Sequence, residues 1–395
     1  MTKEMMHIFF NSLEHVPFQV RYWDGETHRY NEGKASVMII FNQELPPDTN
    51  WTSPSIVLGE AYMDDMIDLE GSMEELLRLL AMNREKFNRQ AASLLAKTAR
   101  LLSRVLEPGN NDSEKNIQHH YDVGNDFYAL WLDPTMSYSC AYFAQPDDSL
   151  EEAQRNKISH TLKKLQLKPG EKILDIGSGW GWLLIEAAEK YGVTATGVTL
   201  SEEQYLATQE RISGHGLQNQ VEVLLADYRT LDQSEYYDKI VSVGMFEHVG
   251  EGNHGSYFQK VNQLLKPGGI SLLHSIMGHK EATTNLWMTR HIFPGGHIPS
   301  LRETIHYLPE YDFHLLHTES LRLHYAKTLD HWLNNYLRHW DTVVDTYGRR
   351  FARMWKLYLM GCAANFRVSG LNVYQLVFSK GLNNQLETTL QHVYR

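Results

Sequence analysis

The sequence predicts an α/β protein in which a largely parallel sheet is flanked by helices and preceded by a smaller α+β domain. Segments typical of strands and helices alternate from about residue 172 onward. The first of these strands ends in a glycine-rich turn that leads into a helix. A chain of 395 residues is also long enough for two domains, and a polar, turn-rich stretch within residues 103–117 provides a boundary.

Residues 1–102 are expected to form the smaller domain. Residues 37–41 and 55–58 are short apolar runs between turn-forming residues, so both are predicted to be strands. Ser72 is followed three residues later by Glu75, which is the pattern of a capping box at the start of a helix.

Residues 118–395 are expected to form one α/β domain, with an insertion around residues 281–345. Within the insertion, residues 281–320 are expected to be helical and irregular, and the apolar loop 292–299 is a candidate lid. The alternating segments are strands at 172–176, 193–200, 221–225, 237–243 and 270–276, and helices at 182–191, from 201 and at 254–265. Ligands of such sheets bind beyond the carboxyl ends of the strands.

Composition excludes several classes of protein. Lys plus Arg is 37 and Asp plus Glu is 48, which gives a net charge of −11. This balance argues against a protein built to bind nucleic acid and against broad adhesion to an anionic membrane. Two cysteines build no disulfide framework, which suits a reducing cytosol. No signal peptide or spanning segment is expected, and the 20 histidines show no metal-ligand spacing.

The glycine-rich turn has the sequence Asp-Ile-Gly-Ser-Gly-Trp-Gly over residues 175–181. Glycines let the backbone approach a ligand closely. The dinucleotide fingerprint requires a third glycine where this chain has Trp182, and no Gly-Lys-Ser/Thr of a P-loop follows. The pattern resembles instead the first motif of S-adenosylmethionine-dependent methyltransferases, and it makes Asp175, Gly177, Gly179 and Gly181 candidate cofactor residues.

The next two strand ends supply further candidates. Methyltransferases usually hold the ribose with an acid after the second strand, and this chain has none there. Gln204 is a candidate replacement, although Ser201 and Gln204 also suit a purely structural role in capping the helix. Asp227 and Tyr228, after the third strand, suit the adenine amine and ring; the alternative is an ordinary loop acid.

Several motifs in order resemble the family of bacterial cyclopropane-fatty-acyl-phospholipid synthases. They comprise Gln-His-His-Tyr-Asp-Val-Gly-Asn-Asp-Phe-Tyr at 118–128, Met-Ser-Tyr-Ser-Cys-Ala-Tyr-Phe at 136–143, the glycine-rich turn, Gly-Met-Phe-Glu-His-Val-Gly at 244–250 and Leu-Leu-His-Ser-Ile at 272–276. The resemblance covers residues 118–381 closely and the N-terminal part loosely. It implies transfer of a methylene group from S-adenosylmethionine to a cis double bond of a phospholipid acyl chain, with bicarbonate bound as the base.

The resemblance also implies site residues. The expected holders of bicarbonate are Cys140, Glu247, His274, Tyr325 and the main chain of Ile276. A pairing of Cys140 with His274 as a nucleophile is an alternative that the chemistry does not require. Packing, helix capping or a core position is the structural alternative for each. The predicted cofactor-binding residues are Tyr121, Tyr138, Ser139, Asp175, Gly177, Gly179, Gly181, Thr199, Leu200, Gln204, Asp227 and Tyr228.

The expected partners are an unsaturated phospholipid, a membrane surface and a second copy of the chain. The protein is expected to be cytoplasmic and to associate peripherally with the inner face of the cell membrane. Arg349, Arg350, Arg353 and Lys356 lie in an amphipathic segment that suits phosphate headgroups or, equally, a solvated helix face. Residues Trp332, Tyr336 and Trp340 are expected on one helical face, in the core or in a lipid pocket. The alternative functions are a lipid methyltransferase that closes no ring and a lipid-binding protein without catalysis.

Overall fold

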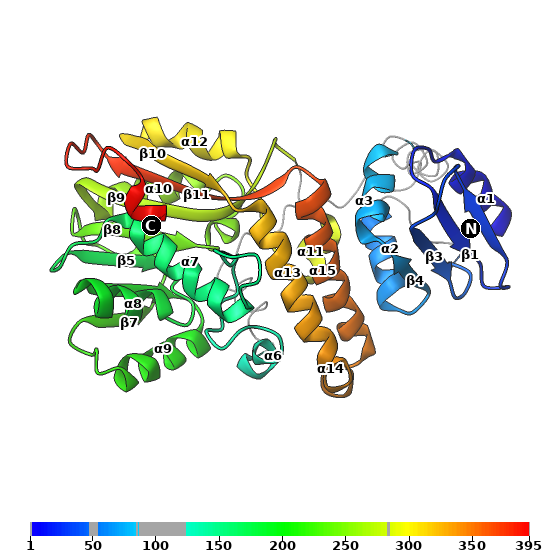
Figure 1. Cartoon of the computed structure of the whole chain (residues 1–395), viewed down its shortest axis with the longest axis horizontal. Coiled ribbons are helices and arrows are strands. Elements are labelled where there is room, and N and C mark those ends of the chain that lie inside the picture. The colour runs from blue at the N-terminus through cyan, green and yellow to red at the C-terminus, as the bar shows by residue number, and fades with distance from the viewer. Residues whose placement is uncertain (1, 47–53, 84–85, 87–123, 283–284, 395) are drawn as a thin grey trace, which may run out of the picture. The chain divides into compact units, whose positions relative to one another are not determined.

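The computed structural model describes residues 2–46, 54–83, 86, 124–282 and 285–394. The chain divides into two compact units (Figure 1). The first comprises residues 1–110, 285–292 and 336–369, and the second comprises residues 111–284, 293–335 and 370–395. This division places 336–369 with the N-terminal residues, whereas the sequence assigned them to the α/β domain. The predicted linker, residues 103–117, lies outside the described residues.

The first unit contains a four-stranded sheet in the order β2-β1-β3-β4. Strand β1 is parallel to β3, and the other pairings are antiparallel. The bounds are α1 (Lys3–Ser12), β1 (Phe18–Arg21), β2 (Thr27–Tyr30), β3 (Val37–Phe41), α2 (Pro54–Met63), β4 (Ile67–Gly71), α3 (Met73–Met82), α11 (Leu286–His291), α14 (Trp340–Tyr347) and α15 (Arg349–Val368). Helix α15 packs against α2 and α3, and its Ala364 joins the core of this unit. This packing explains why 336–369 belong here.

One predicted strand of this unit is wrong. Residues 55–58 lie in helix α2, which begins at Pro54. A run of four apolar residues does not distinguish a strand from a turn of buried helix, and proline is well suited to a first helical turn. Close packing accompanies the helix: a Cβ at Gly59 would lie 2.3 Å from the Trp287 side chain. The strand at Val37–Phe41 and the cap at Ser72, whose side chain accepts from the Glu75 N–H, are confirmed.

The second unit contains a seven-stranded sheet in the order β10-β11-β9-β8-β5-β6-β7. The strands from β9 to β7 are parallel, and β11 and β10 add to this sheet in antiparallel fashion. The predicted α/β class is therefore confirmed. The strand bounds are β5 (Lys172–Ile176), β6 (Thr194–Thr199), β7 (Val221–Leu225), β8 (Tyr237–Val243), β9 (Leu265–Gly278), β10 (Phe313–Ser320) and β11 (Leu371–Lys380).

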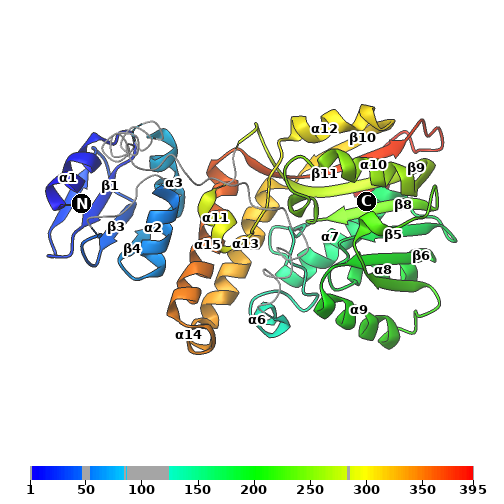
Figure 2. The ribbon, with the colours of Figure 1, turned by 180° about the vertical axis from the view of Figure 1, so that it is seen from behind.

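Helices cover both faces of this sheet (Figures 1 and 2). Successive strand residues point to opposite faces, so Ile173 packs with α7 (Leu150–Leu165), α8 (Trp182–Tyr191) and α9 (Glu202–Gly214). Its neighbour Leu174 packs with α10 (His254–Leu264) and α12 (Leu301–Glu310). The remaining elements are α6 (Asn125–Ala129), η1 (Tyr228–Thr230), η2 (Phe246–His248), α13 (Arg322–Arg338) and α16 (Gln391–Tyr394).

One expectation for the insertion is wrong. Residues 313–320, expected to be helical or irregular, form strand β10 because they pair along β11, a partner that lies far away in the sequence. Trp340 begins a separate helix, α14, after α13 ends at Arg338, but its ring still contacts that of Tyr336, as expected for a shared face. Trp332 is buried in the second unit, where its ring contacts those of Trp131, Tyr138 and Tyr325.

Candidate active site

The glycine-rich turn connects β5 to α8 in a conformation that requires glycine. Gly177, Gly179 and Gly181 have φ values of 84°, 53° and 83°. A Cβ at Gly177 would lie 2.8 Å from the side chain of Met245, and one at Gly181 would lie 2.4 Å from that of Thr208. Because these three residues have no side chain, the backbone of the turn faces the cavity above it directly.

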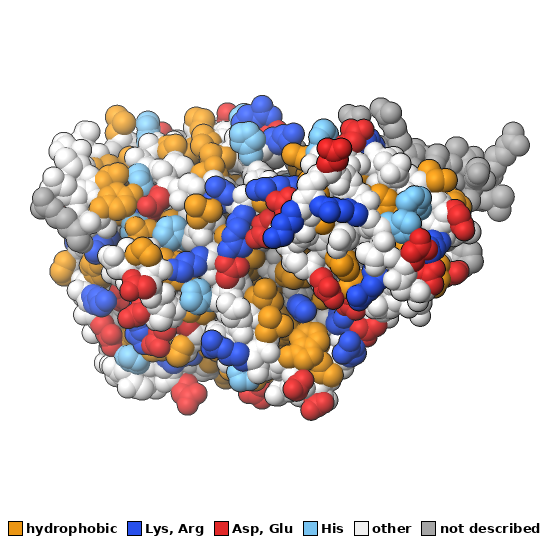
Figure 3. Space-filling view, turned by 45° about the vertical axis from the view of Figure 1, so that its right-hand side comes forward, with side chains coloured by type: hydrophobic (Ala, Val, Ile, Leu, Met, Phe, Trp, Pro, Cys, Tyr) orange, Lys and Arg blue, Asp and Glu red, His pale blue; other side chains and the backbone are white. Residues whose placement is uncertain are grey.

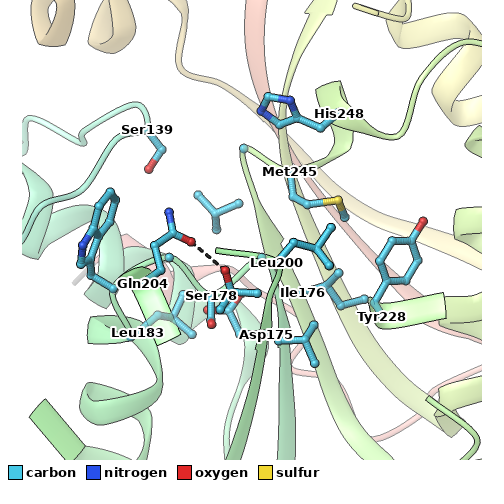
Figure 4. A pocket seen from close by; sticks show the side chains of 18 of the residues that line it. Ser139, Asp175, Ile176, Ser178, Leu183, Leu200, Gln204, Tyr228, Met245 and His248 are labelled. Atoms are coloured by element: carbon cyan, nitrogen blue, oxygen red, sulfur yellow. Dashed lines mark hydrogen bonds between the residues drawn. The ribbon is translucent and has the colours of Figure 1, made fainter. Parts of the chain in front are cut away.

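A cavity lies at the carboxyl ends of β5, β6, β7 and β8 (Figure 4). The predicted cofactor residues that line it are Tyr138, Ser139, Asp175, Gly177, Gly179, Gly181, Thr199, Leu200, Gln204, Asp227 and Tyr228. Tyr121 lies outside the described residues. The structure thus brings together residues from separate motifs, and their roles as cofactor ligands stay a prediction.

The end of β6 has no acid, and two hydrogen bonds organise it instead. The Thr199 hydroxyl donates to Gln204 Oε1 at 2.8 Å, and the Ser201 hydroxyl accepts from the Gln204 N–H at 3.3 Å. Ser201 therefore caps α9 as expected. Because the Gln204 amide oxygen already accepts from the Thr199 hydroxyl, the amide nitrogen is the part of Gln204 that can act as a donor at the cavity wall (Figure 4).

The end of β7 presents Asp227 and Tyr228. The Asp227 carboxylate accepts from the Arg229 N–H at 2.8 Å and from its guanidinium Nε at 2.8 Å. Burial opposes the charge of Asp227, but these bonds to Arg229 outweigh it and lower the pKa of the carboxyl. An ionised Asp227 fits an acceptor for an amine, and the Tyr228 ring forms part of the wall beside it.

Asp175 contains a polar atom that the protein does not satisfy. Its side chain is 3 % exposed, and Oδ1 has no hydrogen-bond partner among the described residues. Burial raises the pKa of Asp175 to about 7, although nearby Lys157 works against the shift. An unpaired buried acceptor costs about 1–3 kcal/mol, so this atom favours a ligand that carries a donor or a positive charge.

Lys157 is a cavity residue that the sequence analysis missed. Its ammonium donates to the Ser139 hydroxyl at 2.9 Å, and burial lowers its pKa to about 8. Its charge acts on Asp175, on Cys140 and on His274. A sequence signal was present, because Lys157 falls on the buried side of α7 where an apolar residue is expected.

Glu247 and Ile276 are brought together at the ends of β8 and β9. Glu247 Oε1 accepts from the Ile276 N–H at 2.6 Å, while Oε2 is buried with no partner among the described residues. Burial raises the pKa of Glu247, against the bond from Ile276. The Ile276 N–H was expected to donate to a bound anion, and in this structure it donates to Glu247 instead.

His274 lies on β9 with 2 % of its side chain exposed, and its Nδ1 is 3.1 Å from the Gln375 amide nitrogen. Burial and the charges of Lys157 and Lys164 lower the pKa of His274 to about 3, so the ring is neutral at pH 7. Among the described residues, the Glu247 carboxylate accepts no hydrogen bond from the His274 ring. The Glu247 turn instead meets His274 through its backbone, where the Gly244 N–H donates to the His274 carbonyl at 2.9 Å.

Cys140 and Tyr325 lie near one another at the start of α13. The Cys140 thiol is 3.8 Å from the Leu321 carbonyl, which also accepts from the Tyr325 N–H at 3.0 Å. Burial raises the pKa of Cys140, so the thiol stays protonated at neutral pH. The nearby charge of Lys157 favours the thiolate, but burial outweighs it. Among the described residues the thiol contacts the Ala141 and Leu321 carbonyls and no base, which argues against a nucleophilic Cys140. None of the predicted catalytic residues lines the cavity described above.

The loop after Phe293 packs on η2. The His297 N–H donates to the Glu247 carbonyl at 3.1 Å, and the Phe293 ring meets the His248 ring edge to face at 5.9 Å. His248 lines the cavity, and burial lowers its pKa to about 4. Residues 293–299 of the predicted lid therefore contact the segment that carries Glu247.

Three of the four residues of the predicted basic surface on α15 are ion-paired, and the fourth, Lys356, lies over the Trp340 ring at 5.7 Å from its centroid. Arg349 pairs with Asp65, Arg350 with Asp64, and the buried Arg353 with Asp68 and Asp65. These carboxylates belong to the turn between α2 and β4 and to β4 itself. On the face that Figure 3 shows, acidic and basic side chains are interspersed. No helix within the described ranges is long and apolar enough to cross a bilayer.

Comparison with known proteins identifies relatives for nearly the whole chain. The family model "Mycolic acid cyclopropane synthetase" matches residues 109–376, and a model for a domain of unknown function matches residues 5–92. The cyclopropane-fatty-acyl-phospholipid synthase of Escherichia coli K12 is 38% identical over 377 residues, covering 90% of this chain and 94% of that protein. A probable fatty acid methyltransferase of Pseudomonas putida is 35% identical over 391 residues, covering 96% and 97%.

A solved structure of a cyclopropane synthase is also similar to this chain. The crystal structure of mycolic acid cyclopropane synthase CmaA1, complexed with SAH and CTAB, has a TM-score of 0.64 and 35% identity. It covers 70% of this chain and 99% of the other.

Proposed function

Since the chain belongs to the mycolic acid cyclopropane synthetase family of S-adenosylmethionine-dependent methyltransferases, we propose that it is a cyclopropane-fatty-acyl-phospholipid synthase. The reaction would add a methylene group from S-adenosylmethionine across the cis double bond of an unsaturated phospholipid acyl chain. Its similarity to a synthase of this kind extends along nearly the whole chain and supports the proposal.

The cavity fits the cofactor. Asp175 Oδ1 is a buried acceptor without a partner, which suits the ammonium of the methionine part. Gln204 contributes an amide donor for the ribose, and Asp227 an acceptor for the adenine amine. When bound, S-adenosylmethionine supplies an electron-poor methyl carbon on its sulfonium. The residues of the chain bind and orient it and exclude water.

One observation carries the proposed chemistry: the Cys140 thiol and the His274 imidazole are buried, so the thiol stays protonated and the imidazole stays neutral and weakly basic. The pKa of Cys140 is raised, that of His274 is lowered to about 3, and that of Glu247 is raised, in each case chiefly by burial. An alkene that accepts a methyl group becomes a carbocation, which a strong protein nucleophile would trap. A site without such a nucleophile suits this reaction.

The base is proposed to be a bound bicarbonate, which removes the proton whose loss closes the ring. The Cys140 thiol, the Tyr325 hydroxyl and the imidazole of His274 are donors suited to an anion. The partnerless Glu247 Oε2 is an acceptor for the hydroxyl that bicarbonate itself carries. In this proposal Ile276 holds Glu247 in place through its N–H.

We also propose that the protein acts at the inner face of the cell membrane as a homodimer, since its substrate would be part of that membrane. The arginines of α15 are paired with aspartates, so attachment is expected to depend on apolar contacts more than on this segment. Sedimentation with vesicles and light scattering measure attachment and mass.

The experiment that tests the function uses liposomes of a monounsaturated phospholipid and methyl-labelled S-adenosylmethionine. The proposal expects the label in the acyl chains, and it expects activity to fall in buffer depleted of bicarbonate and to return on adding it. Label that stays out of the lipid, together with calorimetry showing no binding of S-adenosylmethionine, would support the non-catalytic alternative. Activity that is indifferent to bicarbonate would reject the proposed base.

A further inference from the structure

Helix α7 buries a row of polar side chains against the sheet. Gln154, Lys157, Thr161 and Lys164 are spaced by three, four and three residues and are 0 %, 5 %, 0 % and 3 % exposed. This spacing places them on one side of the helix. Burying polar groups is costly unless they are hydrogen-bonded, so the row is expected to have a purpose. The cavity described above includes Lys157, and Thr161 and Lys164 have no role there.

The far end of the row fixes the orientation of the Gln375 amide on β11. Lys164 Nζ donates to Gln375 Oε1 at 2.6 Å, and an ammonium has no acceptor, so this atom must be the amide oxygen. The Gln375 amide nitrogen donates to the Thr161 hydroxyl at 3.1 Å. That hydroxyl must accept, because its own proton is donated to the Lys157 carbonyl at 2.8 Å. Two independent contacts therefore agree on the orientation.

This orientation determines where His274 carries its proton. Gln375 pairs directly with His274 across the β9–β11 ladder, and its amide nitrogen is 3.1 Å from Nδ1. An amide nitrogen is only a donor, so Nδ1 must be the unprotonated nitrogen. The proton of the neutral ring therefore lies on Nε2. No described residue forms a hydrogen bond with Nε2.

The ammonium that starts this chain is held in place by charge. Lys164 pairs with Glu319 of β10, whose carboxylate also accepts from His160 at 2.7 Å. Burial opposes the charge of Glu319, but His160 and Lys164 outweigh it and lower the pKa of this carboxyl to about 2. Glu319 thus stays ionised through neutral pH and keeps Lys164 as a donor.

We infer that Lys164 and Gln375 are positioning residues that hold His274 as its Nε2–H tautomer. The inference rests on the proposed function, because the Nε2–H is then a donor for the small anion that acts as the base. It also excludes His274 as the base. The charged and titratable groups that act on His274 are Lys157, Lys164 and His160 of α7 and Glu319 of β10.

The test is Gln375→Glu, which replaces the amide donor with a carboxylate that only accepts. His274 should then carry a proton on Nδ1. The long-range ¹H–¹⁵N spectrum of ¹⁵N-histidine-labelled protein reports each ring nitrogen without any turnover, and the His274 signal is the one lost in His274→Asn. We expect an unprotonated Nδ1 in the unaltered chain and a protonated Nδ1 in Gln375→Glu.

The pH profile provides a second readout. At high pH the variant would present an Nε2 without a proton, so kcat relative to the unaltered chain should fall about tenfold or more. As the pH falls, the carboxylate should stabilise the doubly protonated ring, restore the Nε2–H and bring the ratio back toward one. A simple structural defect would not produce this recovery. The Kd of S-adenosylmethionine should stay unchanged.

Lys164→Met removes the charge that orients the amide, and Lys239→Met is its matched control. Lys239 is another buried lysine of the same unit, 3.7 Å from Glu171. We expect the His274 signal to shift in Lys164→Met and to stay in Lys239→Met; an unchanged signal in Lys164→Met would refute the role of Lys164. Should Gln375→Glu fail to fold, as judged by circular dichroism, Lys164→Met still tests the inference.

A protonated Nδ1 in the unaltered chain would overturn the inference, as would a tautomer that is unaffected by Gln375→Glu. Failure of the proposed function is a separate result: no cyclopropane product from a chain whose His274 spectrum is as inferred.

Discussion

The substitution Glu247→Gln removes an acceptor and preserves the shape of the side chain. Glu247 Oε1 accepts from the Ile276 N–H at 2.6 Å, and a glutamine oxygen retains that bond. The buried Oε2, which has no partner among the described residues, becomes an amide nitrogen that only donates. The variant therefore cannot accept the hydroxyl of a bound bicarbonate, while the fold around Ile276 is kept.

The size of the effect follows from the bond that is lost. A hydrogen bond to a charged group contributes about 1.5–3 kcal/mol, which corresponds to a fall in kcat of about 10- to 150-fold. Glu247 does not line the cofactor cavity, so the Kd of S-adenosylmethionine should change by less than about twofold.

The assay is the transfer of label from methyl-labelled S-adenosylmethionine to phospholipid, with calorimetry for cofactor affinity. Glu171→Gln is the control, since Glu171 precedes β5, at the opposite end of the strand from the cavity, and contacts Lys239. Turnover as high as in the unaltered chain, or an equal loss of turnover and of cofactor affinity, would refute the role given to Glu247.

Four further predictions concern the cofactor cavity, the glycine-rich turn and α15. Burial raises the pKa of Asp175 to about 7, and a cationic ligand requires the ionised form, so calorimetry should find cofactor affinity rising with pH up to about 7 and then levelling; Asp175→Asn should bind weakly at every pH. Without ligand, the raised pKa means that Asp175 destabilises the fold as the pH rises above its unfolded value of 3.8. The melting temperature of Asp175→Asn relative to that of the unaltered chain should therefore rise between pH 3.8 and about 7, and a relative fall would contradict this. Gly181→Ala should lower the free energy of unfolding by about 1–3 kcal/mol and cost more than Gly179→Ala, because a Cβ meets a side chain at 2.4 Å at Gly181 and nothing within 4 Å at Gly179; equal melting temperatures would count against this. Arg350→Gln should leave vesicle binding nearly unchanged, because Arg350 is paired with Asp64, and a large loss in sedimentation would restore the basic-surface hypothesis.

The elements with strong local signals could be predicted from the sequence. The strand 172–176, the glycine-rich turn and the helix 182–191 were predicted correctly, because positive φ angles and a strand-to-helix change leave a clear pattern. The cap at Ser201 was also predicted correctly, since capping is decided by a few neighbouring residues.

Features that depend on distant partners could not be predicted. Strand β10 exists because of its pairing with β11, and the arginines of α15 are neutralised by aspartates nearly 300 positions away. The contact of the Ile276 N–H with Glu247, and that of His274 with Gln375, likewise join separate strands or turns. Local sequence reports none of these contacts.

Lys157 and Lys164 illustrate an intermediate case. Lysines in a helix are usually exposed to solvent. Only their positions on the buried side of α7 distinguish Lys157 and Lys164 from exposed lysines. The row that they form with Gln154 and Thr161 was visible as spacing, but its partners on β9, β10 and β11 were not.

The isotopic composition of the product shows whether the proposed enzyme closes a ring on a phospholipid acyl chain. With S-adenosylmethionine whose methyl group is fully deuterated, ring closure must remove one deuterium from each transferred group and leave a product without a double bond. The account predicts lipids that retain the other deuterium atoms and resist ozonolysis. Lipids that keep the whole deuterated methyl group, or that are still cleaved by ozone, would contradict the account and identify a methyltransferase that closes no ring.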